Sequence, residues 1–233
     1  MSLRLSQSPN GYRYSIDAFL LADFCEVPKG SKILDLGSGC GIVSILLAKA
    51  WPNSQIIGID IQTDMIKFAN KNLQKNKFLQ NIRFIHGDIR EISNYFFREE
   101  FGIIITNPPY YKIGSGRLNP HPEKASARHE IIGGLKEFIH AGFKVLKPKG
   151  SFYIIYTAKR TVELICELVQ NRLEPKILRN VHPKENNNAN LVLIKATKMG
   201  RPGLKILPPI YLFKNDGKYS NEAKRILKKW NFF

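Results

Sequence analysis

A pair of prolines follows an apolar run near the middle of the chain. Asn107, Pro108, Pro109 and Tyr110 come directly after Ile103–Thr106. Each proline lacks an N–H and holds φ near about −65°, so the pair ends a strand, and Pro108 keeps Asn107 out of the α region. The segment predicts a rigid tip that presents an amide, backbone carbonyls and an aromatic ring. Such a tip suits a planar amine, because the carbonyls accept its hydrogens while Tyr110 stacks on its ring.

The tetrapeptide Asn107–Tyr110 resembles the active-site motif of amino-methyltransferases, and this resemblance implies methylation of an amine. An aromatic amine is a poor nucleophile, because its lone pair is delocalised into its ring. If Asn107 Oδ1 and the Pro108 carbonyl each accept one N–H, the nitrogen moves toward tetrahedral geometry and its lone pair is freed. These bonds strengthen as positive charge develops, which lowers the barrier. The methyltransferases that the tetrapeptide resembles act on adenine, cytosine, guanine N2 or glutamine.

A glycine-rich segment is the second candidate site. Residues 33–42 read Ile-Leu-Asp-Leu-Gly-Ser-Gly-Cys-Gly-Ile, which indicates a strand, a turn and a helix. Glycines there permit positive φ and close approach of a ligand to the backbone. The dinucleotide fingerprint needs a further glycine where this chain has Ile42. The pattern instead resembles the first motif of class I S-adenosylmethionine-dependent methyltransferases, with cofactor-binding candidates Asp35, Gly37, Ser38, Gly39 and Gly41.

Acidic residues also follow the next two predicted strands. Asp60, followed by Ile61, could accept hydrogens from ribose hydroxyls, and Asp88, followed by Ile89, could accept from an adenine amine. A single acid at a strand end is more often a helix N-cap. Three such acids in succession, with the glycine turn, predict a nucleoside cofactor at the carboxyl edge of a parallel sheet, close to Asn107.

The alternation of apolar runs with helical patterns predicts an α/β fold, which we interpret as a Rossmann-like class I methyltransferase. Helical stripes occur at Ile66–Leu73 and Leu135–Leu146, the latter stopped by residues 147–150, and a further helix is expected at Lys159–Asn171. We expect seven strands with helices on both faces, the last two forming an antiparallel hairpin: Lys32–Leu36, Gln55–Ile59, Asn81–His86, Gly102–Thr106, Ser151–Tyr156, Lys176–Val181 and Asn190–Ala196.

The organisation predicted is one methyltransferase domain over residues 1–233. Residues 1–30 would cover the cofactor, 31–199 would form the core, and 200–233 would be a basic extension. The extension has a short strand candidate, Pro209–Phe213, and a helix candidate, Asn221–Trp230, with an apolar face of Ala223, Ile226, Leu227 and Trp230. Residues 111–128 lack periodicity and are interpreted as a functional lid or a disordered loop.

The charge balance favours a polyanionic partner. The chain of 233 residues has 36 Lys and Arg against 19 Asp and Glu, a net charge of +17. Phosphates neutralised by such a surface release counterions, although a merely solvated basic surface is the alternative. The three cysteines show no ligand spacing, so no metal is expected. No signal or membrane-spanning pattern occurs, and we expect a cytoplasmic protein, a monomer favoured over an undetermined oligomer.

Three flanking segments extend the resemblance to one family. Residues 7–22, residues 127–130 (Ala-Arg-His-Glu) and residues 207–211 followed by 215–220 resemble bacterial tRNA1(Val) adenine-N6 methyltransferases, which modify adenine 37 beside the anticodon. The resemblance implies that S-adenosylmethionine is the cofactor and tRNA the partner, and that Tyr14, Asp35, Gly37, Asp60 and Asp88 lie around the cofactor, with Asn107 facing both ligands.

The sequence says less about which residues contact the substrate. Arg128 and His129 are candidates for tRNA phosphates or for a plain helix start, and Lys112 follows the tip where relatives often have an aromatic residue. Other acceptors stay open. These are glutamine in release factors, whose methyltransferases usually have an additional helical domain, and guanine N2 in rRNA. A noncatalytic RNA-binding subunit is a further alternative, but it would not retain Asn107, Pro108, Asp60 and the glycine turn together.

Overall fold

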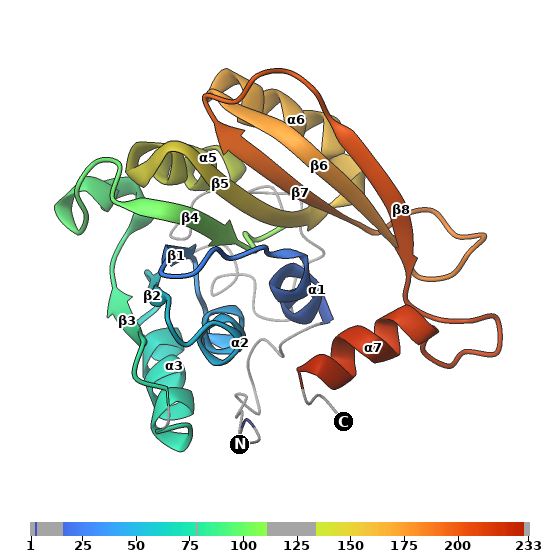
Figure 1. Ribbon diagram of the computed structural model, residues 1–233, viewed down its shortest axis with the longest axis horizontal. Coiled ribbons are helices and arrows are strands. Elements are labelled where there is room, and N and C mark those ends of the chain that lie inside the picture. The colour runs from blue at the N-terminus through green and yellow to red at the C-terminus, as the bar shows by residue number, and fades with distance from the viewer. Residues whose placement is uncertain (1–2, 4–15, 78, 111–133, 231–233) are drawn as a thin grey trace, which may run out of the picture.

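The core of the molecule is a single mixed sheet (Figure 1). The computed structural model describes residue 3 and residues 16–77, 79–110 and 134–230. Within them, eight strands follow the order β3-β2-β1-β4-β5-β7-β6-β8. The first five are parallel to one another: β1 (Lys32–Leu36), β2 (Gln55–Asp60), β3 (Ile82–His86), β4 (Phe101–Thr106) and β5 (Leu146–Thr157). The predicted Rossmann-like α/β class is confirmed.

The antiparallel hairpin is confirmed, but the prediction of seven strands is wrong. Strands β6 (Leu173–His182) and β7 (Leu191–Lys198) form the hairpin, and β8 (Lys205–Tyr211) is an eighth strand, parallel to β6. The sequence indicates only a short strand at Pro209–Phe213. Pro208 and Pro209 weaken the strand signal because they lack N–H groups, yet an edge strand tolerates them. Arg179 Nε of β6 donates to the Pro208 carbonyl at 2.8 Å.

Strand β5 also begins earlier than the sequence indicates. Residues 147–150 include Pro148 and Gly150, a pattern that predicts a break between a helix and a strand beginning at Ser151. The strand instead begins at Leu146, which pairs with Phe101 of β4 across a register shift. Lys149 adopts φ of +64° in this irregular stretch. Pairing with β4 therefore outweighs the local stop signal.

Helices cover both faces of the sheet, as predicted (Figure 1). One apolar cluster joins the sheet to α1 (Ile16–Phe24), α2 (Ile42–Ala50), α3 (Thr63–Lys75) and α7 (Asn221–Lys229). A second cluster joins the opposite face to the 3-10 turn η1 (Ile89–Asn94), α5 (Leu135–Val145) and α6 (Thr161–Gln170). A short turn, η2 (Ala158–Arg160), leads from β5 into α6. Among the described residues, no helix has the length and apolar character needed to cross a membrane.

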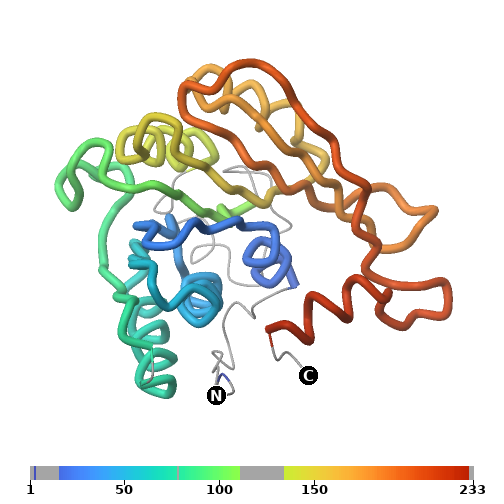
Figure 2. The backbone as a smooth tube through the Cα atoms, viewed as in Figure 1, coloured from blue at the N-terminus to red at the C-terminus, as the bar shows by residue number. Residues whose placement is uncertain are grey.

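The last described helix, α7, which is red in Figure 2, contacts α1, which is blue. Arg225 and Lys229 of α7 pair with Asp23 of α1, at 3.1 and 2.7 Å. The Trp230 ring lies 6.4 Å from that of Trp51. Burial of the whole predicted apolar face is confirmed: Ala223, Ile226, Leu227 and Trp230 are all at most 2% exposed. The contacts tie the two ends of the described chain to one face of the sheet.

Four parallel strands end at the same edge of the sheet. Leu36 of β1 pairs with Ile59 of β2 and with Thr106 of β4, and Asp60 pairs with His86 of β3. The buried Thr106 hydroxyl donates to the Leu36 carbonyl at 2.9 Å, which fixes β4 beside β1. Parallel strands place the segments that follow them along one edge. This edge brings the glycine turn, the acids and the prolines together.

Candidate active site

The glycine turn between β1 and α2 has open space at one position and close packing at another. Gly41 is the N-cap residue of α2 and has φ of +81°, and a Cβ there would lie 2.4 Å from the Phe84 ring. Gly39 has φ of +54°, but a Cβ there would meet nothing within 4 Å. A glycine at position 41 is therefore required by the protein's own core. The space above Gly39 is open to a ligand.

Asp60 is anchored beside this turn. Its Oδ2 accepts from the Gly39 N–H and its Oδ1 from the Gln62 N–H, both at 2.8 Å. The side chain is buried, and this burial raises the pKa of the carboxyl despite the hydrogen bonds from Gly39 and Gln62. A carboxylate offers about four acceptor positions, so acceptor capacity remains for a ligand hydroxyl. The ribose contact of Asp60 stays a prediction.

Asp35 lies deeper than the other acids. It is 2% exposed, and its Oδ2 accepts from the Ser44 hydroxyl of α2 at 2.6 Å. Burial raises the pKa of the Asp35 carboxyl to about 7, and the negative charge of Asp60 adds to the effect, whereas the Ser44 hydroxyl opposes it. A cationic ligand nearby would favour the ionised form. Ser44 gave no signal in the sequence, because its role depends on the packing of α2.

The buried Asp35 predicts a pH-dependent effect of Asp35→Asn. Because the folded-state pKa of about 7 lies above the ordinary value of 3.8, the stability that this carboxyl contributes is present below the unfolded pKa. That stability is lost as the pH rises through 7. The variant, which cannot ionise, should therefore gain on the unmodified protein as the pH rises. We expect its relative free energy of unfolding to increase by about 2 kcal/mol between pH 5 and pH 8.

Chemical denaturation without ligand at both pH values measures this difference. Asp64→Asn on the exposed surface of α3 is the matched control, because it removes the same charge without burial. The control should shift the free energy of unfolding by less than about 0.5 kcal/mol at either pH. A relative loss of stability for Asp35→Asn on going from pH 5 to pH 8 would contradict the burial argument.

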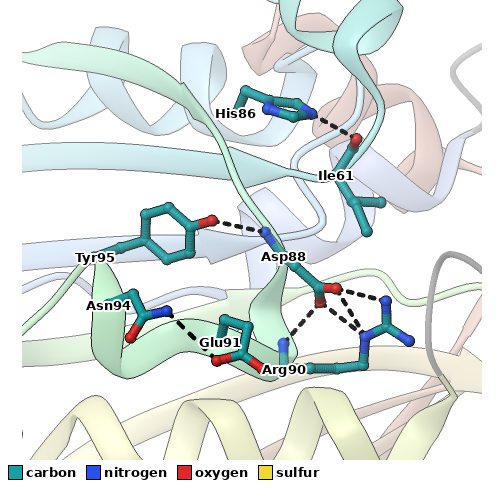
Figure 3. Close-up of polar contacts among 7 residues, drawn as sticks. All are labelled: Ile61, His86, Asp88, Arg90, Glu91, Asn94 and Tyr95. Atoms are coloured by element: carbon teal, nitrogen blue, oxygen red, sulfur yellow. Dashed lines mark hydrogen bonds and ion pairs between the residues drawn. The ribbon is translucent and has the colours of Figure 1, made fainter.

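Asp88 caps η1 at the edge of the sheet where the parallel strands end (Figure 3). Its Oδ1 accepts from the Arg90 N–H at 2.9 Å, which caps η1. Arg90 Nε lies 2.8 and 3.0 Å from the two carboxylate oxygens, and these bonds lower the pKa of Asp88. The backbone N–H of Asp88 faces the Tyr95 hydroxyl at 3.4 Å. The helix-cap alternative is thus confirmed for Asp88, and its contact with an adenine amine stays a prediction.

The two isoleucines predicted beside the cofactor differ in exposure. The Ile61 carbonyl lies 2.9 Å from His86 Nε2, which links the ends of β2 and β3 (Figure 3), and its side chain is half-buried. Ile89 is 5% exposed and belongs to the core beneath α5. Ile61 therefore has side-chain surface available to a ligand, whereas Ile89 mainly anchors η1.

The diproline tip follows β4 as expected and is held by several side chains. Pro108 is buried, whereas Asn107, Pro109 and Tyr110 are half-buried. The Tyr110 hydroxyl lies 2.8 Å from Asn107 Oδ1 and 2.9 Å from Asp17 Oδ2 of α1.

The ring and backbone of Tyr110 have further partners. Arg160 Nη1 donates to the Tyr110 carbonyl at 3.2 Å. The Tyr156 ring meets the Tyr110 ring edge to face, with centroids 5.6 Å apart and planes at 87°. Neither Arg160 nor Tyr156 was predicted, because neither belongs to a motif. Asp17 stands in the N-terminal segment used for the family resemblance, but the sequence assigned it no role.

The structure brings most of the predicted site to one edge. Tyr14, Lys112, Arg128 and His129 lie outside the described residues, so their roles stay predictions. Within residues 16–77, 79–110 and 134–230, no group of three or more His, Cys, Asp or Glu side chains could hold a metal ion.

The described edge fits a nucleoside cofactor. Ser38 Oγ is buried and has no hydrogen-bond partner among the described residues, and the space over Gly39 is open. Buried polar atoms are normally satisfied, so this hydroxyl is a candidate for a ligand contact, and that contact stays a prediction. Asp60 adds unused acceptor capacity at the same place.

Comparison with known proteins supports the interpretation of the chain as a methyltransferase. The family model described as a methyltransferase domain matches residues 28–230. A tRNA1(Val) (adenine(37)-N6)-methyltransferase of Flavobacteriaceae bacterium (strain 3519-10) is 29% identical over 171 residues, which cover 72% of this chain and 70% of that protein. A protein of the same name from Pedobacter heparinus is 23% identical over 224 residues, 96% of this chain and 93% of its own. The family resemblance found in the sequence is confirmed.

Solved structures show the same fold. A predicted O-methyltransferase from Agrobacterium tumefaciens has a TM-score of 0.76 at 19% identity, over 92% of this chain and 96% of its own. The geranyl diphosphate C-methyltransferase of Streptomyces coelicolor A3(2), solved with S-adenosyl-L-homocysteine, has a TM-score of 0.58 at 13% identity over 78% of each chain. With the family model spanning most of the sequence, the protein belongs to the methyltransferase-domain family.

Proposed function

We propose that this protein transfers the methyl group of S-adenosylmethionine to the exocyclic N6 amine of an adenine in tRNA, with adenine 37 of tRNA1(Val) as the expected target. The observation that supports this most is the meeting of Gly39, Asp60 and the Asn107–Tyr110 tip at one sheet edge. A cofactor over the glycine turn would stand beside an acceptor on the tip. The names of the relatives supply the tRNA substrate and the adenine.

The cofactor would lie along the glycine turn. Asp60 would accept hydrogens from the ribose hydroxyls, Ser38 Oγ would gain the partner it lacks, and Asp88 would face the adenine amine. The buried carboxylate of Asp35 would complement the positive charge of the cofactor. When bound, S-adenosylmethionine supplies an electrophilic methyl carbon, so the new nitrogen–carbon bond forms while the electrons of the carbon–sulfur bond leave with sulfur.

The tip would act on the methyl acceptor. Asn107 Oδ1 and the Pro108 carbonyl accept the two amine hydrogens, which draws the nitrogen lone pair out of the base. Tyr110 stacks on the base, a contact worth about 1–3 kcal/mol. The adenine must leave its stack to reach the tip. The nitrogen gains positive charge as the bond forms, and its surplus proton then passes to solvent.

A transfer assay tests the substrate class. Tritiated S-adenosylmethionine is incubated separately with unmodified tRNA, rRNA and a release factor, and the methylated product is identified by mass spectrometry. Incorporation into tRNA as N6-methyladenosine is expected. Methylated glutamine in the release factor, or methylated guanine in rRNA, would replace the proposed acceptor with one of the alternatives. RNA binding without any transfer would leave only a binding role.

The affinity for tRNA should fall steeply with salt. The chain has a net charge of +17, and each neutralised phosphate of single-stranded RNA contributes about −0.7 to the double-logarithmic slope. We therefore expect a slope of about −3 or steeper between about 50 and 300 mM salt in filter-binding or anisotropy titrations.

Exposed lysines of α7 allow a matched comparison. Lys224 and Lys228 lie on the outer side of this helix, whereas Lys29 lies before β1, at the opposite edge of the sheet from the tip. Replacing Lys224 and Lys228 with Gln should make the slope shallower by about 1, and Lys29→Gln should leave it unchanged. A slope near zero for the unmodified protein would rule out phosphate-dominated docking.

A further inference from the structure

The Tyr110 hydroxyl lies between two oxygen atoms from distant parts of the chain. Its oxygen is 2.9 Å from Asp17 Oδ2, in the first turn of α1, and 2.8 Å from Asn107 Oδ1. Asp17 and Tyr110 are 93 residues apart in sequence. A phenol has a single hydrogen on its oxygen, so it can donate fully to only one of these acceptors.

Asp17 is the stronger acceptor of the two. Hydrogen bonds to an ionised carboxylate are roughly twice as strong as those to a neutral amide oxygen. The first turn of a helix also favours negative charge, because its backbone N–H groups point toward that end. The Tyr110 hydrogen therefore points to Asp17. The remaining lone pairs of the phenol oxygen then face Asn107.

The direction of the Tyr110 hydrogen determines the orientation of the Asn107 amide. Two oxygen atoms 2.8 Å apart with no hydrogen between them repel each other. Rotation of the planar amide by a half-turn exchanges its oxygen and nitrogen, which lets the amide NH₂ donate to the phenol oxygen. The same rotation directs Oδ1 away from Tyr110.

We propose that Asp17 is a positioning residue that acts through the Tyr110 hydroxyl to set the orientation of the Asn107 amide. With the Tyr110 hydrogen held by Asp17, the NH₂ group of Asn107 is bound to the phenol, and its oxygen is free to accept from the amine of the substrate. In the opposite orientation the amide would present N–H groups to the N–H groups of the amine. This inference rests on the role proposed for Asn107 in methyl transfer.

The surroundings of Tyr110 support a fixed phenol. Arg160 binds its carbonyl, Tyr156 packs against its ring, and the Asp17 contact is half-buried. Arg160 is in turn held by Glu163, whose carboxylate oxygens lie 2.6 and 2.8 Å from the guanidinium nitrogens. The ring position is therefore determined independently of Asp17. Loss of Asp17 should change the hydrogen-bond direction rather than the packing.

A double-mutant cycle tests the proposal. Asp17→Asn keeps the side-chain shape but removes the preference for accepting, and Tyr110→Phe keeps the ring but removes the hydroxyl. Each should lower the single-turnover rate constant of methyl transfer by about tenfold, and the double variant by about the same tenfold, because both changes break one relay. Asp23→Asn, on the same helix but paired with α7, is the control and should leave the rate unchanged. Independent losses that multiply to about a hundredfold would overturn the proposal.

An NMR measurement separates this inference from the proposed function. The side-chain amide signals of Asn107, assigned with Asn107→Ala, should shift in both Asp17→Asn and Tyr110→Phe, because both remove the directed bond. Signals that stay in place in Asp17→Asn would overturn the positioning role, whatever the activity. If the unmodified protein methylates no RNA but the signals shift in both variants, the proposed function fails and the positioning of Asn107 by Asp17 stands.

Discussion

Replacing Asn107 with alanine should reduce the rate constant for methylation of tRNA by about a hundredfold, while the affinity for S-adenosylmethionine stays within about twofold. The amide oxygen accepts from an amine that becomes positively charged, and a hydrogen bond to a charged group is worth about 1.5–3 kcal/mol. This interaction strengthens only in the transition state, so its loss lowers the rate more than it weakens binding. Single-turnover kinetics and calorimetric titration with the cofactor measure the two quantities.

Asn53→Ala is the matched control for this prediction. Asn53 is exposed and lies just before β2, at the edge of the sheet opposite the tip. This substitution removes the same functional group and should leave both the rate and the cofactor affinity unchanged. Unchanged turnover in Asn107→Ala would refute the role assigned to the tip. A parallel loss of cofactor affinity would instead assign Asn107 to cofactor binding.

Gly39→Leu should reduce the affinity for S-adenosylmethionine by about a hundredfold. The backbone at Gly39 has φ of +54°, and a Cβ built there would enter open space. If the cofactor occupies this space, the added side chain would collide with it and would also disturb the 2.8 Å bond from the Gly39 N–H to Asp60. Loss of one hydrogen bond and of the adjacent packing together account for about 2–3 kcal/mol. Calorimetric titration measures the affinity.

Gly30→Leu separates cofactor exclusion from backbone strain. Gly30 has φ of +77°, and a Cβ at this position would also meet nothing within 4 Å, but the residue lies in the turn before β1, at the far edge of the sheet. A left-handed conformation costs a leucine about 1–2 kcal/mol at either position. Both variants should therefore lose similar stability in denaturation, and only Gly39→Leu should lose affinity. Equal affinities in the two variants would place the cofactor elsewhere.

Local patterns predicted the bounds of β1 to β4 closely. The predicted bounds of β1 are those of the structure, and those of β2, β3 and β4 differ by one residue at an end. Each of these strands is a short apolar run between a turn and a helix, so its conformation is encoded by its own residues. The glycine turn and the diproline tip were found for the same reason, since glycine and proline restrict the backbone locally.

The extents of β5 and β8 depend on pairing with neighbouring strands. Strand β8 contains Pro208 and Pro209, and it is a strand only because it pairs with β6 at the edge of the sheet. Strand β5 extends back to Leu146 because β4 pairs with it through a register shift. In both places the local signal indicates an interruption, and pairing with another segment supplies the hydrogen bonds that decide otherwise.

The sequence by itself determined the fold class, the glycine turn, the acids at the strand ends and the Asn107–Tyr110 tip, because each depends on residues close together in the chain. Only the tertiary structure decided that Asp35 is buried against Ser44, and that Asp17 reaches Tyr110 across 93 residues. Burial and hydrogen-bond direction arise from how distant elements pack, and no local pattern encodes them.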